Sequence, residues 1–378
     1  MGRQESQKIL MRIAALCLLL YIFLVGITVL SGAVKSLGSG VISGEAMAAV
    51  SNPFMGLVIG ILATTMVQSS SVTTSLVVGL VGGGMLDVGM AIPIIMGANI
   101  GTTVTSSIAA LGHVGNREEF KRAFSAATCH DFFNYITVLV LLPIELMTGY
   151  LAKSSAVIST WFTAGSAEKY KSPFKASLKF FYKNIKAGVN GLFDEPGTSA
   201  KVVLAFVGLA LIFTCLVLIV KLMRTIVLDR LQAAVSTVLD KSIFVGLFVG
   251  VVMTIAAQSS SITTSVMVPL AGAGVITMYQ VMPLVLGANI GTTVTALIAA
   301  VAVTGDAADA ARQIAIVHLL FNVTGIVLIY AIPKAIDVPI RLSTRLAEVA
   351  DRSKTWAIAY IVGIFYGLPA LILFVSKL

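Results

Sequence analysis

The sequence predicts an all-α polytopic membrane protein with two inverted-topology repeats, each containing a re-entrant helical hairpin and a broken transmembrane helix. Of its 378 residues, 57% are hydrophobic and 11% are charged, and the mean hydropathy is +0.98. Soluble domains carry roughly a quarter charged residues, so this composition indicates a chain that is mostly embedded in lipid. The second observation is an internal repeat, because residues 258–301 match residues 68–111 at 24 of 44 positions without a gap.

The repeated stretch preserves polar residues in the same order. Both copies contain QSSS, then TTS, a single proline and GANIGTTVT. Unpaired hydroxyls and amides are costly in hydrocarbon, so polar clusters at membrane depth usually line a site or cavity. Helix packing through small residues is the alternative, and it explains Ser and Gly at three- or four-residue spacing. It does not explain runs such as 68–71, which circle a helix, so the motifs indicate a binding site.

The first half begins with a basic segment followed by the apolar residues Ile13–Leu30. We expect these residues to form the first transmembrane helix, with the N-terminus in the cytoplasm. The small, polar segment 36–50 is expected to be a loop or a surface helix. The apolar stretches 53–67 and 76–81 flank QSSS, and each is shorter than the roughly 20 helical residues that a crossing needs. They predict a re-entrant hairpin with QSSS near its tip.

The next apolar stretch, Met90–Leu111, is long enough to cross but has GANIGTT in its middle. Glycines on both sides of Asn99 lower the helix propensity, so we predict a broken helix. Ala123–Tyr150 is expected to cross back. It carries His130 and Asn134, whose spacing favours a buried structural bond over a proton relay.

Residues 151–200 are rich in lysine and aromatic residues, and they are predicted to be an extracytoplasmic connecting loop with one amphipathic helix. Their lysines run against the usual preference of basic loops for the cytoplasm. The second half repeats the scheme. We expect a crossing at Val202–Val220, a second hairpin from residue 244, a second broken helix at Met282–Val303 and a return crossing at Ile314–Ile332.

The chain ends with a basic cytoplasmic segment, 334–354, and a last apolar helix, Trp356–Val375. Three crossings separate equivalent points of the two halves, and an odd number inverts the second repeat. Paired helix breaks in inverted repeats are typical of secondary transporters, whose substrate binds where the breaks meet. The predicted divisions are 1–150 (first repeat), 151–200 (connecting loop), 201–333 (second repeat) and 334–378 (basic segment and C-terminal helix).

The motifs contain neither a carboxylate nor a lysine, so their chemistry comes from hydroxyls, amides and backbone groups. Neutral oxygens suit a hard monovalent cation, and helix N-termini with hydroxyls suit an oxyanion. Sodium together with a small oxyanion satisfies both, and the pattern leaves the oxyanion open. The net charge of +9 gives no argument for nucleic acid, because the basic residues lie in short segments between apolar runs. The three cysteines all fall in apolar stretches and suggest neither a disulfide framework nor a metal site.

Paired QSSS motifs, each followed by GANIGTT, resemble those of the type II sodium–phosphate cotransporter family. The resemblance extends to segments 122–134 and 139–143. It implies sodium-coupled uptake of inorganic phosphate, a lipid-embedded carrier with no enzymatic activity, and no cofactor besides sodium as the coupling ion. The chain lacks the long cytoplasmic tails of the animal members, so we expect a bacterial inner-membrane protein, and a homodimer is compatible with this expectation.

The resemblance assigns the sodium and phosphate sites to the hairpin tips and the neighbouring unwound helices. The expected binding residues are Gln68, Ser69, Ser70, Ser71, Thr73, Asn99, Thr102, Thr103, Gln258, Ser259, Ser260, Ser261, Thr263, Asn289, Thr292 and Thr293. Sodium itself is expected to bind through Ser70, Asn99, Ser260 and Asn289.

Three other functions are compatible with parts of this pattern. A sodium-coupled carrier of another small oxyanion would use the same groups. An ion channel could line its pore with GANIGTT, although paired hairpins are an elaborate structure for an ungated pore. An intramembrane hydrolase could pair Ser70 with His130, but nothing in the sequence resembles a nucleophile elbow.

Overall fold

The computed structural model describes residues 3–37, 49–163, 173–195, 197–238, 242–305 and 307–376, and these residues contain helices but no strand. Seven helical stretches within them are long and apolar enough to cross a membrane. The chain is therefore an integral, multi-pass, all-α membrane protein, as the composition predicts. Most of the expected surface segment 36–50 lies outside the described residues.

The first half contains the predicted hairpin and the predicted interruption. Its elements are α1 (Arg3–Leu37), α3 (Pro53–Val67), α4 (Ser70–Gly82), α5 (Val88–Thr102), α6 (Val104–Ala110), the 3-10 turn η1 (Leu111–His113) and α7 (Arg117–Thr148). Helices α3 and α4 have 15 and 13 residues, too few for either to cross alone. The interruption lies at Thr103, at the end of the motif, whereas Asn99 remains inside α5.

The second half repeats the hairpin but not the break. Its elements are α10 (Thr198–Val238), α11 (Ile243–Ala257), α12 (Ser260–Gly272), α13 (Met278–Ala302) and α14 (Ala308–Ala331). Helix α13 continues for 25 residues through the whole GANIGTT motif. The prediction of a second broken helix is therefore wrong.

The glycines of the motif serve helix packing in both halves, so they break neither α5 nor α13. A Cβ on Gly287 would lie 2.1 Å from the carbonyl oxygen of Leu247, so α11 and α13 pack backbone against backbone. A Cβ on Gly97 would likewise lie 2.0 Å from the carbonyl oxygen of Leu57, so α3 and α5 also pack backbone against backbone. Tertiary packing contributes more to helix stability than propensity does, so glycine here marks a close approach and does not end the helix.

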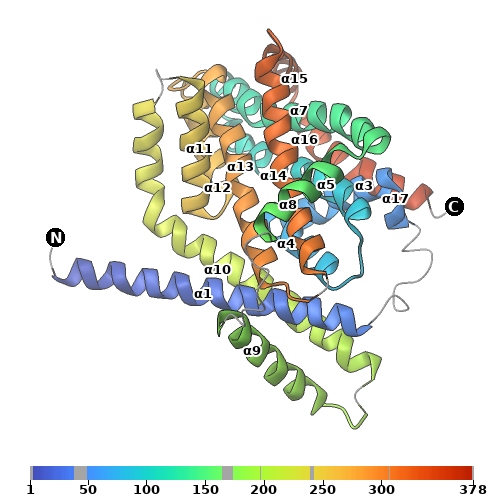
Figure 1. The fold of residues 1–378 in the computed structure, drawn as a ribbon. Coiled ribbons are helices and arrows are strands. Elements are labelled where there is room, and N and C mark those ends of the chain that lie inside the picture. Colours follow the sequence, from blue (N-terminus) through green and yellow to red (C-terminus); the bar gives the residue numbers. More distant parts are fainter. Residues whose placement is uncertain are drawn as a thin grey trace.

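The connection between the halves holds two helices, α8 (Tyr150–Thr163) and α9 (Pro173–Asn190), one more than predicted. The carboxylate of Glu145 accepts hydrogen bonds from the backbone N–H groups of Leu151 and Ala152, at the start of α8. Helix α9 lies against α1, on the side away from the hairpins (Figure 1), and the Tyr21 hydroxyl donates to Ser177 at 2.9 Å.

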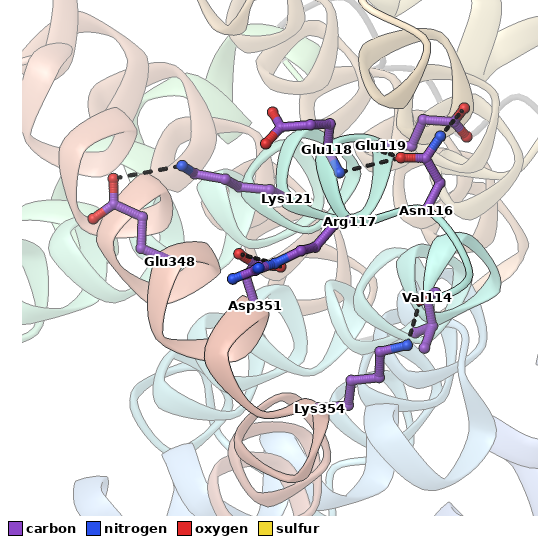
Figure 2. Close-up of polar contacts among 9 residues, drawn as sticks. All are labelled: Val114, Asn116, Arg117, Glu118, Glu119, Lys121, Glu348, Asp351 and Lys354. Atoms are coloured by element: carbon purple, nitrogen blue, oxygen red, sulfur yellow. Dashed lines mark hydrogen bonds and ion pairs between the residues drawn. The ribbon is translucent and has the colours of Figure 1, made fainter.

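The C-terminal elements are α15 (Asp337–Arg352), α16 (Lys354–Val362), the π-helical turn η2 (Gly363–Gly367) and α17 (Leu368–Val375). The last three together form one apolar stretch, as predicted. Helix α15 packs across the N-terminal end of α7. Arg117 pairs with Asp351 at 3.0 Å and Lys121 with Glu348 at 4.0 Å, while the Lys354 ammonium donates to the carbonyl of Val114 (Figure 2).

The two hairpins open toward opposite ends of α13. Gly272, at the end of the second hairpin, accepts a hydrogen bond from Arg122 at 2.8 Å and lies just before α13 begins. Gly82, at the end of the first hairpin, packs against Val303, which follows the last residue of α13. A helix of this length spans about 37 Å, so the open ends of the hairpins are far apart while their tips point toward each other.

Candidate functional site

Each hairpin turns at its QSSS motif through the same backbone geometry. Gln68 has φ 54°, in the left-handed region, and Ser69 is extended. The Ser69 hydroxyl accepts a hydrogen bond from the Val72 N–H at 3.4 Å and caps α4. Gln258 has φ 52° and begins an equivalent turn into α12. A left-handed conformation costs a non-glycine residue roughly 1–2 kcal/mol, so surrounding structure must hold both turns.

The two tips meet at one cavity of about 550 Å³. Six of the residues expected from the sequence line it: Gln68, Ser69, Ser71, Gln258, Ser259 and Ser261. Residues 213–221 of α10 form another wall, which is mostly apolar and ends at Lys221. Motifs 190 positions apart in the sequence therefore share one binding-sized space.

The electrostatics of this cavity suit an anion accompanied by a cation. Helices α4 and α12 both begin at the tips, and the partial positive charge of a helix N-terminus stabilises anions. The Gln258 side-chain nitrogen donates to the carbonyl of Ile255 at 2.8 Å, which leaves its buried Oε1 without a partner. The buried Thr105 hydroxyl, also on the cavity, has no partner either. Such groups can accept from a ligand or coordinate a cation.

Four of the expected hairpin residues do not line the cavity. Ser70 and Ser260 are the first residues of α4 and α12, each 4% exposed. Thr73 and Thr263 lie one turn farther into these helices, and each donates to the carbonyl of the N-cap serine of its own hairpin, at 3.3 and 3.4 Å. The side chains next to the cavity wall therefore form a second polar layer.

The two motif asparagines join the halves of the molecule. The Asn289 side-chain oxygen lies 2.7 Å from Nε2 of His130, and its nitrogen donates to Asn134 at 3.3 Å. In the matching arrangement, Asn322 of α14 donates to the Asn99 side-chain oxygen at 3.3 Å. Each asparagine thus contacts the His–Asn helix of the other half. Neither lines the cavity.

The four motif threonines also lie outside the cavity wall, and each is buried with its hydroxyl bonded to a backbone carbonyl three or four residues earlier. The hydroxyl of Thr102 donates to the carbonyl of Ala98, that of Thr103 to Ile100, that of Thr292 to Ala288 and that of Thr293 to Ile290. The described residues contain no group of three or more His, Cys, Asp and Glu suited to a metal ion, so a cation in this region would rely on neutral oxygens.

Sequence reasoning missed three polar residues that line the cavity, Thr105, Lys221 and Ser265. Lys221 directly follows the predicted crossing Val202–Val220, and nothing in the local sequence indicates that α10 packs beside both tips. Thr105 belongs to the repeated GANIGTTVT motif, so the repeat itself could have identified it. Its counterpart Thr295 is buried and does not line the cavity.

Comparison with known families gives the context for this arrangement. A family model described as "Na+/Pi-cotransporter" matches residues 22–163 and 211–338, which include both hairpins and most of the chain. The chain belongs to the Na+/Pi-cotransporter family. No solved structure matches it.

Its relatives within this family include animal proteins. "Sodium-dependent phosphate transport protein 2B" of Pongo abelii and of Homo sapiens are each 34% identical to the chain over 440 residues, which cover 93% of this chain and 63% of the relative. "Sodium-dependent phosphate transport protein 2A" of Ovis aries is 34% identical over 432 residues, covering 96% of this chain and 67% of the relative. The chain thus spans less than two thirds of the length of the first two.

Proposed function

We propose that this protein takes up inorganic phosphate in symport with sodium, with phosphate bound in the cavity between the QSSS tips. The observation that carries this proposal is that both tips line one cavity in a member of the Na+/Pi-cotransporter family. The relatives named for sodium-dependent phosphate transport support the choice of both ions. This function is transport, with no covalent chemistry for the protein to perform.

Phosphate would be recognised by groups of opposite character. Two helix N-termini and the ammonium of Lys221 favour its negative charge. The unpartnered Oε1 of Gln258 can accept a hydrogen bond from the P–OH of hydrogen phosphate. A fully deprotonated oxyanion has no hydrogen to donate there, so this acceptor favours phosphate over sulfate.

Sodium would be held by Ser70 and Ser260 of the second polar layer and by Asn99 and Asn289 of the neighbouring helices α5 and α13, through hydroxyl and amide oxygens. These side chains are buried close to the tips or to the helices that pack on them. A cation beside the anion reduces the cost of moving a multiply charged ion out of water, which gives a physical reason for coupling. No other cofactor is required.

We further propose that the two repeats are inverted in the membrane, with the N-terminus cytoplasmic. The hairpins open toward opposite ends of α13, as two re-entrant segments entering from opposite faces would do. This arrangement is suited to alternating access around a central site. The bacterial inner-membrane location, the homodimer and the domain boundaries stay predictions.

The decisive experiment is uptake of radiolabelled phosphate into proteoliposomes with an inward sodium gradient or with potassium in its place. Symport predicts saturable uptake that requires sodium. Without a bound sodium ion, the negative charge of phosphate is only partly compensated in the cavity, and phosphate binds less well. Uptake that neither saturates nor depends on sodium would favour a channel and contradict the proposal. Protein-free liposomes provide the background.

Competition distinguishes phosphate from another small oxyanion. Arsenate shares the shape and protonation of phosphate and should inhibit uptake, whereas sulfate should inhibit poorly. A buried acceptor left unpaired costs roughly 1–3 kcal/mol, which corresponds to about 5- to 150-fold weaker binding. Equal inhibition by sulfate would assign the cavity to oxyanions in general.

A further inference from the structure

A second cavity lies near the C-terminal end of α1, beside α9. Its volume is about 360 Å³, and it shares no lining residue with the QSSS cavity. Its charged residues are Lys35 of α1 and Lys179 and Lys183 of α9. Two further residues line it: Gly82, at the open end of the first hairpin, and Thr304, which follows the end of α13. We call it the lysine pocket.

The charged side chains among the described residues that line this pocket are all positive. Among the described residues that line it there are three lysines and no Asp or Glu. Lys179 and Lys183 are four residues apart, so they lie on one face of α9. Like charges at this spacing destabilise a helix, and an anion between them would remove that repulsion. The arrangement is therefore better suited to a bound anion than to solvent alone.

A phenol adds a neutral donor to the lysines. The ring of Tyr182 lies against Gly32, where a Cβ would come within 2.6 Å of it, so only glycine leaves room for the ring. The Tyr182 phenol is protonated near neutral pH without any shift, and burial raises its pKa further, so it is a neutral donor. The Ser31 hydroxyl hydrogen is already directed to the carbonyl of Gly79, at 2.9 Å. Donors toward a ligand thus come mainly from Lys179, Lys183 and Tyr182.

We propose that the lysine pocket binds a phosphate-type anion, either a free phosphate ion or the phosphate headgroup of an anionic lipid. Several ammonium groups around one concave space match the charge of a phosphate group, and lysine is a common phosphate ligand. The end of a membrane-spanning helix lies at the level of the headgroup region, where lipid headgroups and dissolved phosphate are both present. This inference does not depend on the proposed transport function.

The test compares the double variant Lys179→Gln, Lys183→Gln with the control Lys186→Gln, Lys201→Gln. The control pair removes the same charge from α9 and α10 without touching the pocket lining. Purified protein is titrated with radiolabelled inorganic phosphate in lipid-free detergent, and separately with phosphatidylglycerol in native mass spectrometry. The QSSS cavity is intact in both variants, so any difference between them belongs to the lysine pocket.

We expect the pocket variant to bind at least one of the two ligands about fivefold more weakly than the control. A loss confined to inorganic phosphate identifies a free-phosphate site, and a loss confined to phosphatidylglycerol identifies a headgroup site. The charge-preserving variant Lys179→Arg, Lys183→Arg should restore binding. Binding of both ligands that matches the control within twofold, or a loss that arginine does not restore, would overturn the inference.

Discussion

Ser70 and Ser260 each lie between two serines that line the QSSS cavity. Replacing either with alanine removes one hydroxyl from the proposed sodium layer. Unpairing one buried polar group costs roughly 1–3 kcal/mol, so apparent sodium affinity should fall by about 5- to 150-fold. The measurement is uptake against sodium concentration at saturating phosphate, in variants that reach the membrane in normal amount.

Ser155→Ala is the control for this prediction. Ser155 is fully buried on α8, outside the hairpins, and its hydroxyl donates to the carbonyl of Ala152 in the same helix. Alanine favours helix, so this change should leave the sodium curve unchanged. If Ser70→Ala and Ser260→Ala both give curves that match Ser155→Ala, the hairpin serines pack helices and do not bind the coupling ion.

A second residue-level prediction concerns the buried carboxylate of Asp131. Its Oδ2 accepts from the Tyr360 hydroxyl at 2.8 Å and from Ser107 at 3.2 Å, while Oδ1 has no partner. Tyr360→Phe removes one of these donors from a carboxylate inside the membrane domain, so the free energy of unfolding should fall by roughly 1.5–3 kcal/mol. Thermal unfolding in detergent measures the loss. Tyr366→Phe, which removes a longer bond to a backbone carbonyl, should lower the midpoint less.

Among the elements, the hairpins were predictable and the continuous α13 was not. An apolar arm of 15 residues is too short to cross, and this constraint depends only on local sequence. Whether a glycine breaks a helix depends on what lies beside it. Gly287 faces the backbone of α11, and that contact exists only in the folded molecule. Local propensity therefore gave the wrong result where tertiary packing decides.

This packing gives a prediction for Gly287→Ala. The added Cβ would lie 2.1 Å from the Leu247 carbonyl oxygen, which forces α11 away from α13. Overpacking of this kind costs typically 1–3 kcal/mol, so the thermal midpoint should fall. Gly188→Ala on α9 is the control, because its Cβ meets nothing within 4 Å and alanine favours helix by roughly 0.5–1 kcal/mol. A midpoint for Gly287→Ala at or above that of Gly188→Ala would contradict this role.

For the whole molecule, the sequence could predict that the two motifs converge, since both copies keep the same polar residues in the same order. It could not predict which surfaces complete the cavity. Lys221 and its neighbours belong to α10, and only the antiparallel packing of α10 on α1, through Gly26 and Gly208, brings that helix beside the tips. The contacts of Asn289 with His130 and of Asn99 with Asn322, which join the two halves, likewise follow from the packing of the halves on each other.

Inversion of the repeats predicts which loops share a membrane face. The lysine pocket contains residues of α9 together with Thr304 from the loop after α13, so these two regions lie on one face. The loop before α7 lies elsewhere, where Val114 contacts Lys354 (Figure 2). That loop and the loop after α13 occupy equivalent positions in the two repeats, and in parallel repeats they would face the same side.

Single cysteines test this arrangement in a Cys17→Ser background, which removes the exposed native thiol. Ala187→Cys on α9 and Ala307→Cys after α13 should react with a membrane-impermeant maleimide added to intact cells. Gly115→Cys should react only after the membrane is opened. It is chosen because a Cβ there meets nothing within 4 Å, and because the neighbouring Asn116 caps α7 and is best left in place. Labelling of Gly115→Cys and Ala307→Cys from the same side would exclude inverted repeats, and alternating access would then need a different structural basis.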